Sequence, residues 1–132
     1  MSPFRHAFQT ATNASKIGAR RLHASARTLE YYPAVDAKTF TKQVENGSGI
    51  VLVDFYATWC NPCKMLTPIL KKVAEQKNVD LVTVDVDENS EIAAKYQIRA
   101  MPTVIAFKDG KQVNQFMGAL PEPHVKKFVE GL

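Results

Sequence analysis

Residues 50–65 read IVLVDFYATWCNPCKM. The first seven are apolar except for one aspartate and show no alternation, which is typical of a strand buried on both faces. The chain's only two cysteines, Cys60 and Cys63, follow directly. A strand that delivers a Cys-x-x-Cys pair to the start of a helix places one sulfur beside unsatisfied backbone N–H groups, which favour the thiolate. The stretch therefore predicts redox chemistry at a strand-to-helix junction.

Outward from this stretch, strand and helix patterns alternate along the chain and then give way to a hairpin and a helix. The expected elements are a helix from an Asp36 N-cap to near Asn46, a strand at 50–56, a helix at 61–77 kinked by Pro68, a strand at 81–86, a short helix at 92–96, strands at 103–107 and 113–117 joined at Asp109-Gly110, and a helix around 125–129. This order predicts one α/β domain with a central mixed sheet covered by helices on both faces.

Three segments resemble the thioredoxin family. Residues 54–65 are similar to its active-site stretch, residues 96–103 (YQIRAMPT) to the segment that carries its cis-proline, and residues 118–120 (GAL) to the turn into its last helix. They occur in the family's order and spacing, and the resemblance covers roughly residues 30–132. It implies the thioredoxin fold and a protein-disulfide reductase.

The resemblance implies that Cys60 is the attacking thiolate, with a pKa lowered to about 7, and that Cys63 resolves the mixed disulfide. The pair would then alternate between a dithiol and a Cys60–Cys63 disulfide. Taken alone, the pair also fits half of a zinc site or two inert buried side chains. Zinc normally needs four ligands, and His124 is the one further cysteine or histidine after residue 29, so we predict no metal.

Asp54 interrupts an apolar run, which indicates a buried carboxyl whose pKa is raised by burial. An acid at a strand end facing solvent is the alternative. The resemblance implies that Asp54 is a general acid and base for Cys63.

Substrate contacts are expected around Cys60. From base rates Pro102 is an ordinary trans turn proline, whereas the resemblance implies a cis bond and backbone hydrogen bonds from the preceding residue to an extended substrate. For Trp59 alone, a role in packing fits the sequence as well as a role in substrate contact does. The expected substrate-binding residues are Trp59, Asn61, Pro62, Met101, Pro102 and Gly118.

Three positions depart from the family's pattern. Asn61 stands where glycine is usual, Tyr56 where tryptophan is common, and Thr83 where some relatives carry a lysine near the buried aspartate. The residues between the cysteines tune the redox potential, so we expect Asn61 to affect potency and not the type of reaction. With Thr83 in place of a lysine, we expect the titration of Asp54 to differ from that in such relatives.

Charge is distributed unevenly over the 132 residues. The first 29 residues hold five of the 17 Lys and Arg and no acid, so the rest holds 12 basic against 13 acidic residues. The folded part is thus near neutral, and neither a nucleic-acid partner nor a membrane span is predicted. The basic, acid-free segment at 1–29 lacks a secretory apolar run and resembles a mitochondrial presequence cleaved near Glu30, leaving a domain at 30–132 in the matrix. A disordered basic arm or a chloroplast leader are the alternatives.

The predicted function is a monomeric protein-disulfide reductase in mitochondrial redox homeostasis. The resemblance implies that a thioredoxin reductase recycles it with electrons from NADPH, that peroxiredoxins and methionine sulfoxide reductases are among its clients, and that no cofactor is bound. Two alternatives remain open at this point: a thiol oxidase or isomerase of the same fold, and a redox-silent binding adaptor. The redox potential distinguishes the oxidase or isomerase from a reductase, since thioredoxin lies near −270 mV and a strong oxidant such as DsbA near −120 mV.

Overall fold

A computed structural model describes residues 30–132, so the presequence predicted at 1–29 lies outside the described residues. Five strands form one sheet in the order β1-β3-β2-β4-β5. The elements are β1 (Tyr31–Tyr32), α2 (Ala37–Phe40), η1 (Thr41–Glu45), β2 (Ile50–Tyr56), α3 (Asn61–Lys77), β3 (Asp80–Asp85), α4 (Ser90–Lys95), β4 (Thr103–Lys108), β5 (Lys111–Met117) and α5 (Glu122–Glu130). The predicted mixed sheet with helices on both faces is confirmed.

The central strand, β2, runs parallel to β3 and antiparallel to β4. Because side chains alternate along a strand, β2 supplies both faces of the sheet. Val51, Val53 and Phe55 pack into one apolar cluster, whereas Leu52 packs into the other. Its near-continuous apolar sequence follows from this two-sided burial.

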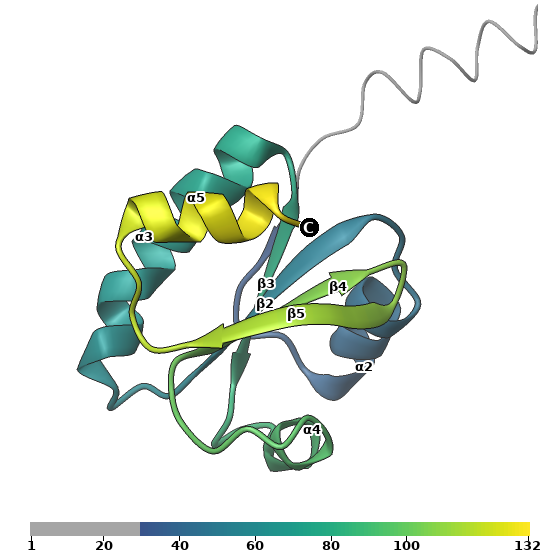
Figure 1. Cartoon of the computed structure of the whole chain (residues 1–132). Coiled ribbons are helices and arrows are strands. Elements are labelled where there is room, and N and C mark those ends of the chain that lie inside the picture. The colour runs from purple at the N-terminus through teal and green to yellow at the C-terminus, as the bar shows by residue number, and fades with distance from the viewer. Residues whose placement is uncertain (1–29) are drawn as a thin grey trace, which may run out of the picture.

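Helices α3 and α5 lie on one side of the sheet, and α2 and α4 lie on the other (Figure 1). Leu66 and Leu70 of α3 meet Val125 of α5 on the first side. Phe40 and Ile92 fill the second side. Each helix thus turns apolar residues toward the sheet, although Met65, an apolar residue of α3, is 70% exposed.

Two local features differ from the sequence prediction. The first helix begins at the predicted cap, where Asp36 Oδ1 accepts from the Thr39 N–H at 2.8 Å, but after Phe40 it continues as a π-helix. Apolar residues four apart fit either kind of turn, so the pattern cannot distinguish them. Strand β1 was not predicted, because two residues are too few to show alternation.

The β4–β5 hairpin turns at Asp109-Gly110, as predicted. Both residues have positive φ, 52° and 83°, which a two-residue turn that matches the strand twist requires. A Cβ added to Gly110 would lie 2.3 Å from the carbonyl oxygen of Glu45. Gly118 has a similar φ of 87°, but a Cβ there would meet nothing within 4 Å.

Gly110→Ala is therefore expected to cost about 3 kcal/mol of unfolding free energy, because a left-handed conformation and a backbone clash act together. Gly118→Ala, the matched control, should cost only about 1 kcal/mol, from the conformation alone. Urea denaturation of both variants measures the difference. Equal losses would show that the clash with Glu45 carries no energy.

Candidate active site

The two cysteines form a disulfide at the N-terminus of α3, with their Cα atoms 5.4 Å apart. Cys60 is the N-cap residue in extended conformation, and its Sγ accepts a hydrogen bond from the Cys63 N–H at 3.2 Å. Asn61 and Pro62, both exposed, form the first turn between them. Both cysteines are buried in this disulfide form, at 5% and 2% exposure. The backbone thus already directs an N–H group at Cys60 and not at Cys63.

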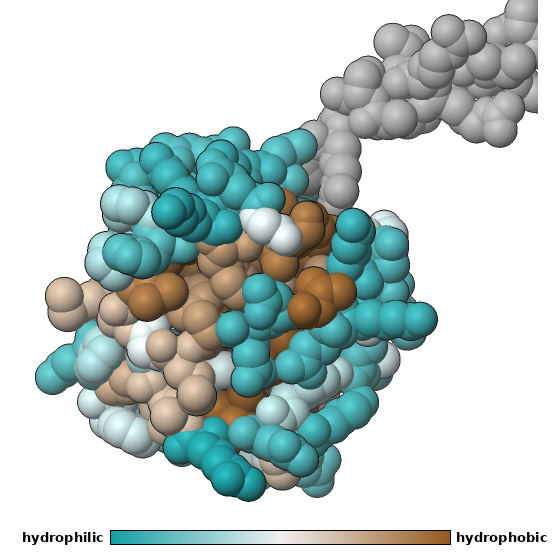
Figure 2. All heavy atoms as spheres, in the orientation of Figure 1, coloured by the Kyte–Doolittle hydropathy of each residue, from teal (hydrophilic) through white to brown (hydrophobic). Residues whose placement is uncertain are grey.

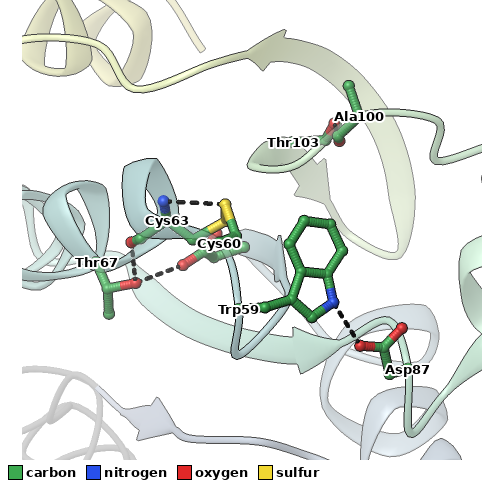
Figure 3. Close-up of a disulfide and its surroundings, with 8 residues drawn as sticks. Trp59, Cys60, Cys63, Thr67, Asp87, Ala100 and Thr103 are labelled. Atoms are coloured by element: carbon green, nitrogen blue, oxygen red, sulfur yellow. Dashed lines mark hydrogen bonds between the residues drawn. A yellow bond between two sulfur atoms is a disulfide. The ribbon is translucent and has the colours of Figure 1, made fainter.

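Trp59 lies beside the disulfide and is 66% exposed. Its Nε1–H donates to Asp87 Oδ2 at 3.0 Å, which holds the ring over the loop that follows β3 (Figure 3). Since β2 and β3 are parallel, their carboxyl ends meet at one edge of the sheet and bring these two loop residues together. Asp87 was not expected from the sequence.

A second loop meets the disulfide from the start of β4. The Met101–Pro102 peptide bond is cis, the form that the resemblance implies. Met101 packs against the cluster of Ala57, Cys60 and Cys63. Gly118 joins this loop, because its N–H donates to the Pro102 carbonyl at 2.9 Å.

Apolar side chains extend from this junction over the surface. Met65 and Met117 are 70% and 60% exposed, and Trp59 adds an exposed ring. Figure 2 shows a pale-brown, apolar area at the lower left, where Figure 1 places the N-terminal end of α3. An exposed apolar surface therefore lies around the disulfide.

Asp54 lies under this surface with no exposed area. By strand alternation it points with Leu52 toward α3, and the solvent-facing alternative is excluded. Its Oδ2 accepts from the Thr67 hydroxyl at 3.0 Å, whereas its Oδ1 has no hydrogen-bond partner within residues 30–132. Burial raises the pKa of Asp54 to about 6, and the Thr67 bond opposes that rise. A group with this pKa can gain or lose a proton near neutral pH.

A pocket of about 550 Å³ lies on the α3 side of the disulfide. Cys63, Thr67 and Thr83 line it together with two lysines, Lys64 and Lys71, whereas Asp54 does not reach it. Within the described residues, no group of three or more His, Cys, Asp or Glu side chains could hold a metal ion. Over the same residues, no helix is long and apolar enough to cross a membrane.

The sequence profile of the thioredoxin family matches residues 32–131. The chain belongs to the thioredoxin family. A thioredoxin from Aspergillus fumigatus is 49% identical over 89 residues, covering 65% of this chain and 81% of the relative. A thioredoxin from Staphylococcus aureus is 43% identical over 93 residues, covering 69% and 88%. Among solved structures, a variant thioredoxin from Halobacterium salinarum NRC-1 is similar, with a TM-score of 0.71 and 36% identity over 77% of this chain and 89% of that one.

Membership of the thioredoxin family and the Cys60–Cys63 pair make the chain a protein-disulfide oxidoreductase that acts by thiol-disulfide exchange. Family members act with a thioredoxin reductase and with client proteins. The departure noted at Thr83 has a structural counterpart, because this residue is the β3 partner of Asp54 in the sheet register. A hydroxyl, and not a cation, therefore lies beside the buried acid in this thioredoxin.

Thr67 is, after Asp87, a second site residue that sequence reasoning missed. Its hydroxyl also lies 3.0 Å from the carbonyl oxygen of Cys63. One signal was available: residues four apart share a helix face, so Thr67 had to lie directly behind Cys63.

Proposed function

We propose that this chain is a monomeric thioredoxin of the mitochondrial matrix that reduces disulfides in client proteins. NADPH would supply the electrons through a thioredoxin reductase, and peroxiredoxins and methionine sulfoxide reductases would be among the clients. The dithiol itself carries two electrons, so the proposal requires no bound cofactor.

One observation carries the assignment of roles to the two cysteines. The Cys63 N–H donates to the Cys60 sulfur at a helix N-terminus, where negative charge is favoured. We assign Cys60 as the thiolate that attacks a client disulfide, forming a mixed disulfide and releasing one client thiolate. The Cys63 thiolate then attacks the Cys60 sulfur, which releases the second client thiolate and leaves the Cys60–Cys63 disulfide. Two electrons pass to the client in each cycle.

Cys63 must lose its proton before this second step. We assign that proton to Asp54 as general base, through an intervening water. Two facts support the assignment: Asp54 is buried on the α3 side of the sheet, and its pKa of about 6 leaves it mostly ionised at neutral pH.

Client binding is proposed for the apolar surface around the disulfide. The exposed Trp59 ring and the Met101-Pro102 loop flank Cys60, and Asn61, Pro62 and Gly118 complete the surface. An extended client segment could pair with the Met101 backbone, so that recognition depends on main chain more than on client sequence.

The matrix location rests on the first 29 residues, which are basic, free of acid and without a secretory apolar run. Cells that express the full chain with a C-terminal tag and the Cys63→Ser substitution test location and clients together. We expect mitochondrial protein shortened to begin near residue 30, carrying mixed disulfides that dithiothreitol releases.

The control is the same chain with both cysteines replaced by serine, which should reach mitochondria but carry no adducts. A tagged protein that stays full-length in the cytosol would contradict the location. Adducts that persist in the double variant would contradict the chemistry.

A further inference from the structure

The Thr67 hydroxyl stands between two acceptors. Its Oγ1 lies 3.0 Å from Asp54 Oδ2 and 3.0 Å from the carbonyl oxygen of Cys63, and Figure 3 draws the bond to Cys63. A hydroxyl has one proton and makes one well-aligned hydrogen bond as a donor at a time. A protonated Asp54 that donates to Thr67 would let both short contacts be full hydrogen bonds, whereas an ionised Asp54 leaves the two oxygens to compete for one proton.

We propose that Thr67 is a positioning residue that couples the protonation state of Asp54 to the backbone of Cys63. When Asp54 is a carboxylate, Thr67 donates to Oδ2, and the Cys63 carbonyl loses that hydrogen bond. When Asp54 is an acid, its Oδ2–H donates to Thr67 Oγ1, and Thr67 donates to the Cys63 carbonyl. One proton is gained or lost, and the hydroxyl proton only changes its acceptor.

The turn of α3 that carries Cys63 lies next to a carbonyl that lacks its usual helix donor. Pro68 lies inside α3 and has no N–H to donate to the Lys64 carbonyl one turn earlier. The Thr67 hydroxyl supplies a bond to the neighbouring carbonyl, that of Cys63, in the turn that carries the resolving thiol. Gain or loss of this bond should therefore change how firmly the turn is held.

Other groups around Asp54 do not replace Thr67. In the described part of the chain, the Thr67 hydroxyl is the one hydrogen-bond donor to this carboxyl. The polar and titratable groups on the elements around Asp54 are Tyr56 on β2, Thr83 and Asp85 on β3, and Cys63, Lys64 and Lys71 on α3. Thr83 Oγ1 accepts from the Ala34 N–H at 2.7 Å, whereas the donor to Asp54 is Thr67. On β4 the register partner of Asp54 is the apolar Val104.

The test is an NMR titration of the Asp54 carboxyl carbon in the oxidised protein, where neither cysteine titrates. Thr67→Val removes the hydroxyl at nearly constant shape and should move the Asp54 midpoint upward by roughly one pH unit, because the carboxylate loses its hydrogen bond. Thr67→Ser keeps the hydroxyl and should restore the midpoint. Thr67→Ala serves as a second hydroxyl-free variant with high helix propensity.

The carbonyl carbon of Cys63 reports the coupling itself. In the wild type and in Thr67→Ser its chemical shift should follow the Asp54 midpoint, and in Thr67→Val it should lose most of this pH dependence. Thr83→Val is the matched control: it removes a hydroxyl from the same pocket and should lower stability while leaving the Asp54 midpoint in place.

An Asp54 midpoint that is unchanged in both Thr67→Val and Thr67→Ala would overturn the proposal, as would an unaltered Cys63 response. The kinetic meaning of the coupling rests on the proposed role of Asp54, but the titration needs no activity. If the wild type fails to reduce disulfides, the proposed function is contradicted. The titration of Asp54 still decides by itself whether Thr67 couples Asp54 to Cys63.

Discussion

Cys60→Ser is expected to abolish the reduction of insulin disulfides by NADPH and thioredoxin reductase, leaving only the background rate. The serine hydroxyl remains protonated near neutral pH and cannot replace the thiolate as a nucleophile toward sulfur. We do not expect the Cys63 sulfur to take over the attack, because the Cys63 N–H is directed at residue 60 and stabilises a thiolate there. Insulin turbidity and NADPH consumption measure the loss.

The matched variant is Cys63→Ser, which keeps the attacking thiol and should still form one mixed disulfide per molecule without turnover. Alkylation separates the two cysteines further. In the reduced protein, Cys60 should react with iodoacetamide near neutral pH, and the Cys60→Ser protein should react much more slowly. Full turnover by Cys60→Ser would show that the nucleophile is misassigned.

Local patterns predicted the parts of the fold that position this chemistry. The apolar run of β2 and the apolar spacing of α3 each lie within one continuous segment, so neither needed knowledge of distant residues. Strand β1 was not predicted, because its two residues form a strand only through their pairing with Leu81 and Val82, which lie fifty residues away. Its existence depends on tertiary structure and not on its own sequence.

The same distinction applies to the site. Asp54 was predictable as a buried acid, because its apolar neighbours are adjacent in sequence. Asp87 and Thr67 were not predicted, since their roles depend on which strand end and which helix face meet the disulfide. The cis bond at Pro102 was implied by the resemblance to the thioredoxin family, whereas the low frequency of cis X-Pro bonds in folded proteins predicts a trans bond.

Asp54→Asn is expected to stabilise the oxidised protein by about 2–3 kcal/mol at pH 7. Burial raises the pKa of this carboxyl from 3.8 to about 6, which at 1.36 kcal/mol per pKa unit corresponds to about 3 kcal/mol for holding the charge inside. Asparagine removes that charge and keeps an oxygen that can accept from Thr67. Against a total stability of about 5–15 kcal/mol, the change is large.

The pH dependence separates this cause from a packing effect. Between about pH 4 and pH 6 the folded state holds the Asp54 proton while the unfolded state has released it, so wild-type stability falls as pH rises through this window. The gain from Asp54→Asn should therefore be small at pH 4, grow up to about pH 6 and stay constant above it. Urea denaturation at each pH measures the curve.

Asp36→Asn is the control with the opposite sign. The Thr39 N–H at the cap of α2 holds the pKa of the exposed Asp36 below its usual range, so its charge favours folding and its loss should bring no gain at neutral pH. A gain from Asp54→Asn that is the same at pH 4 and pH 7 would show that better packing, and not removal of a buried charge, is responsible. The ionised Asp54 carboxyl lowers the stability of the fold at neutral pH, and the cluster on its side of the sheet, which includes Leu52, Leu66 and Val104, is apolar. A destabilising group in such a place favours a functional role, which we assign to moving the proton of Cys63.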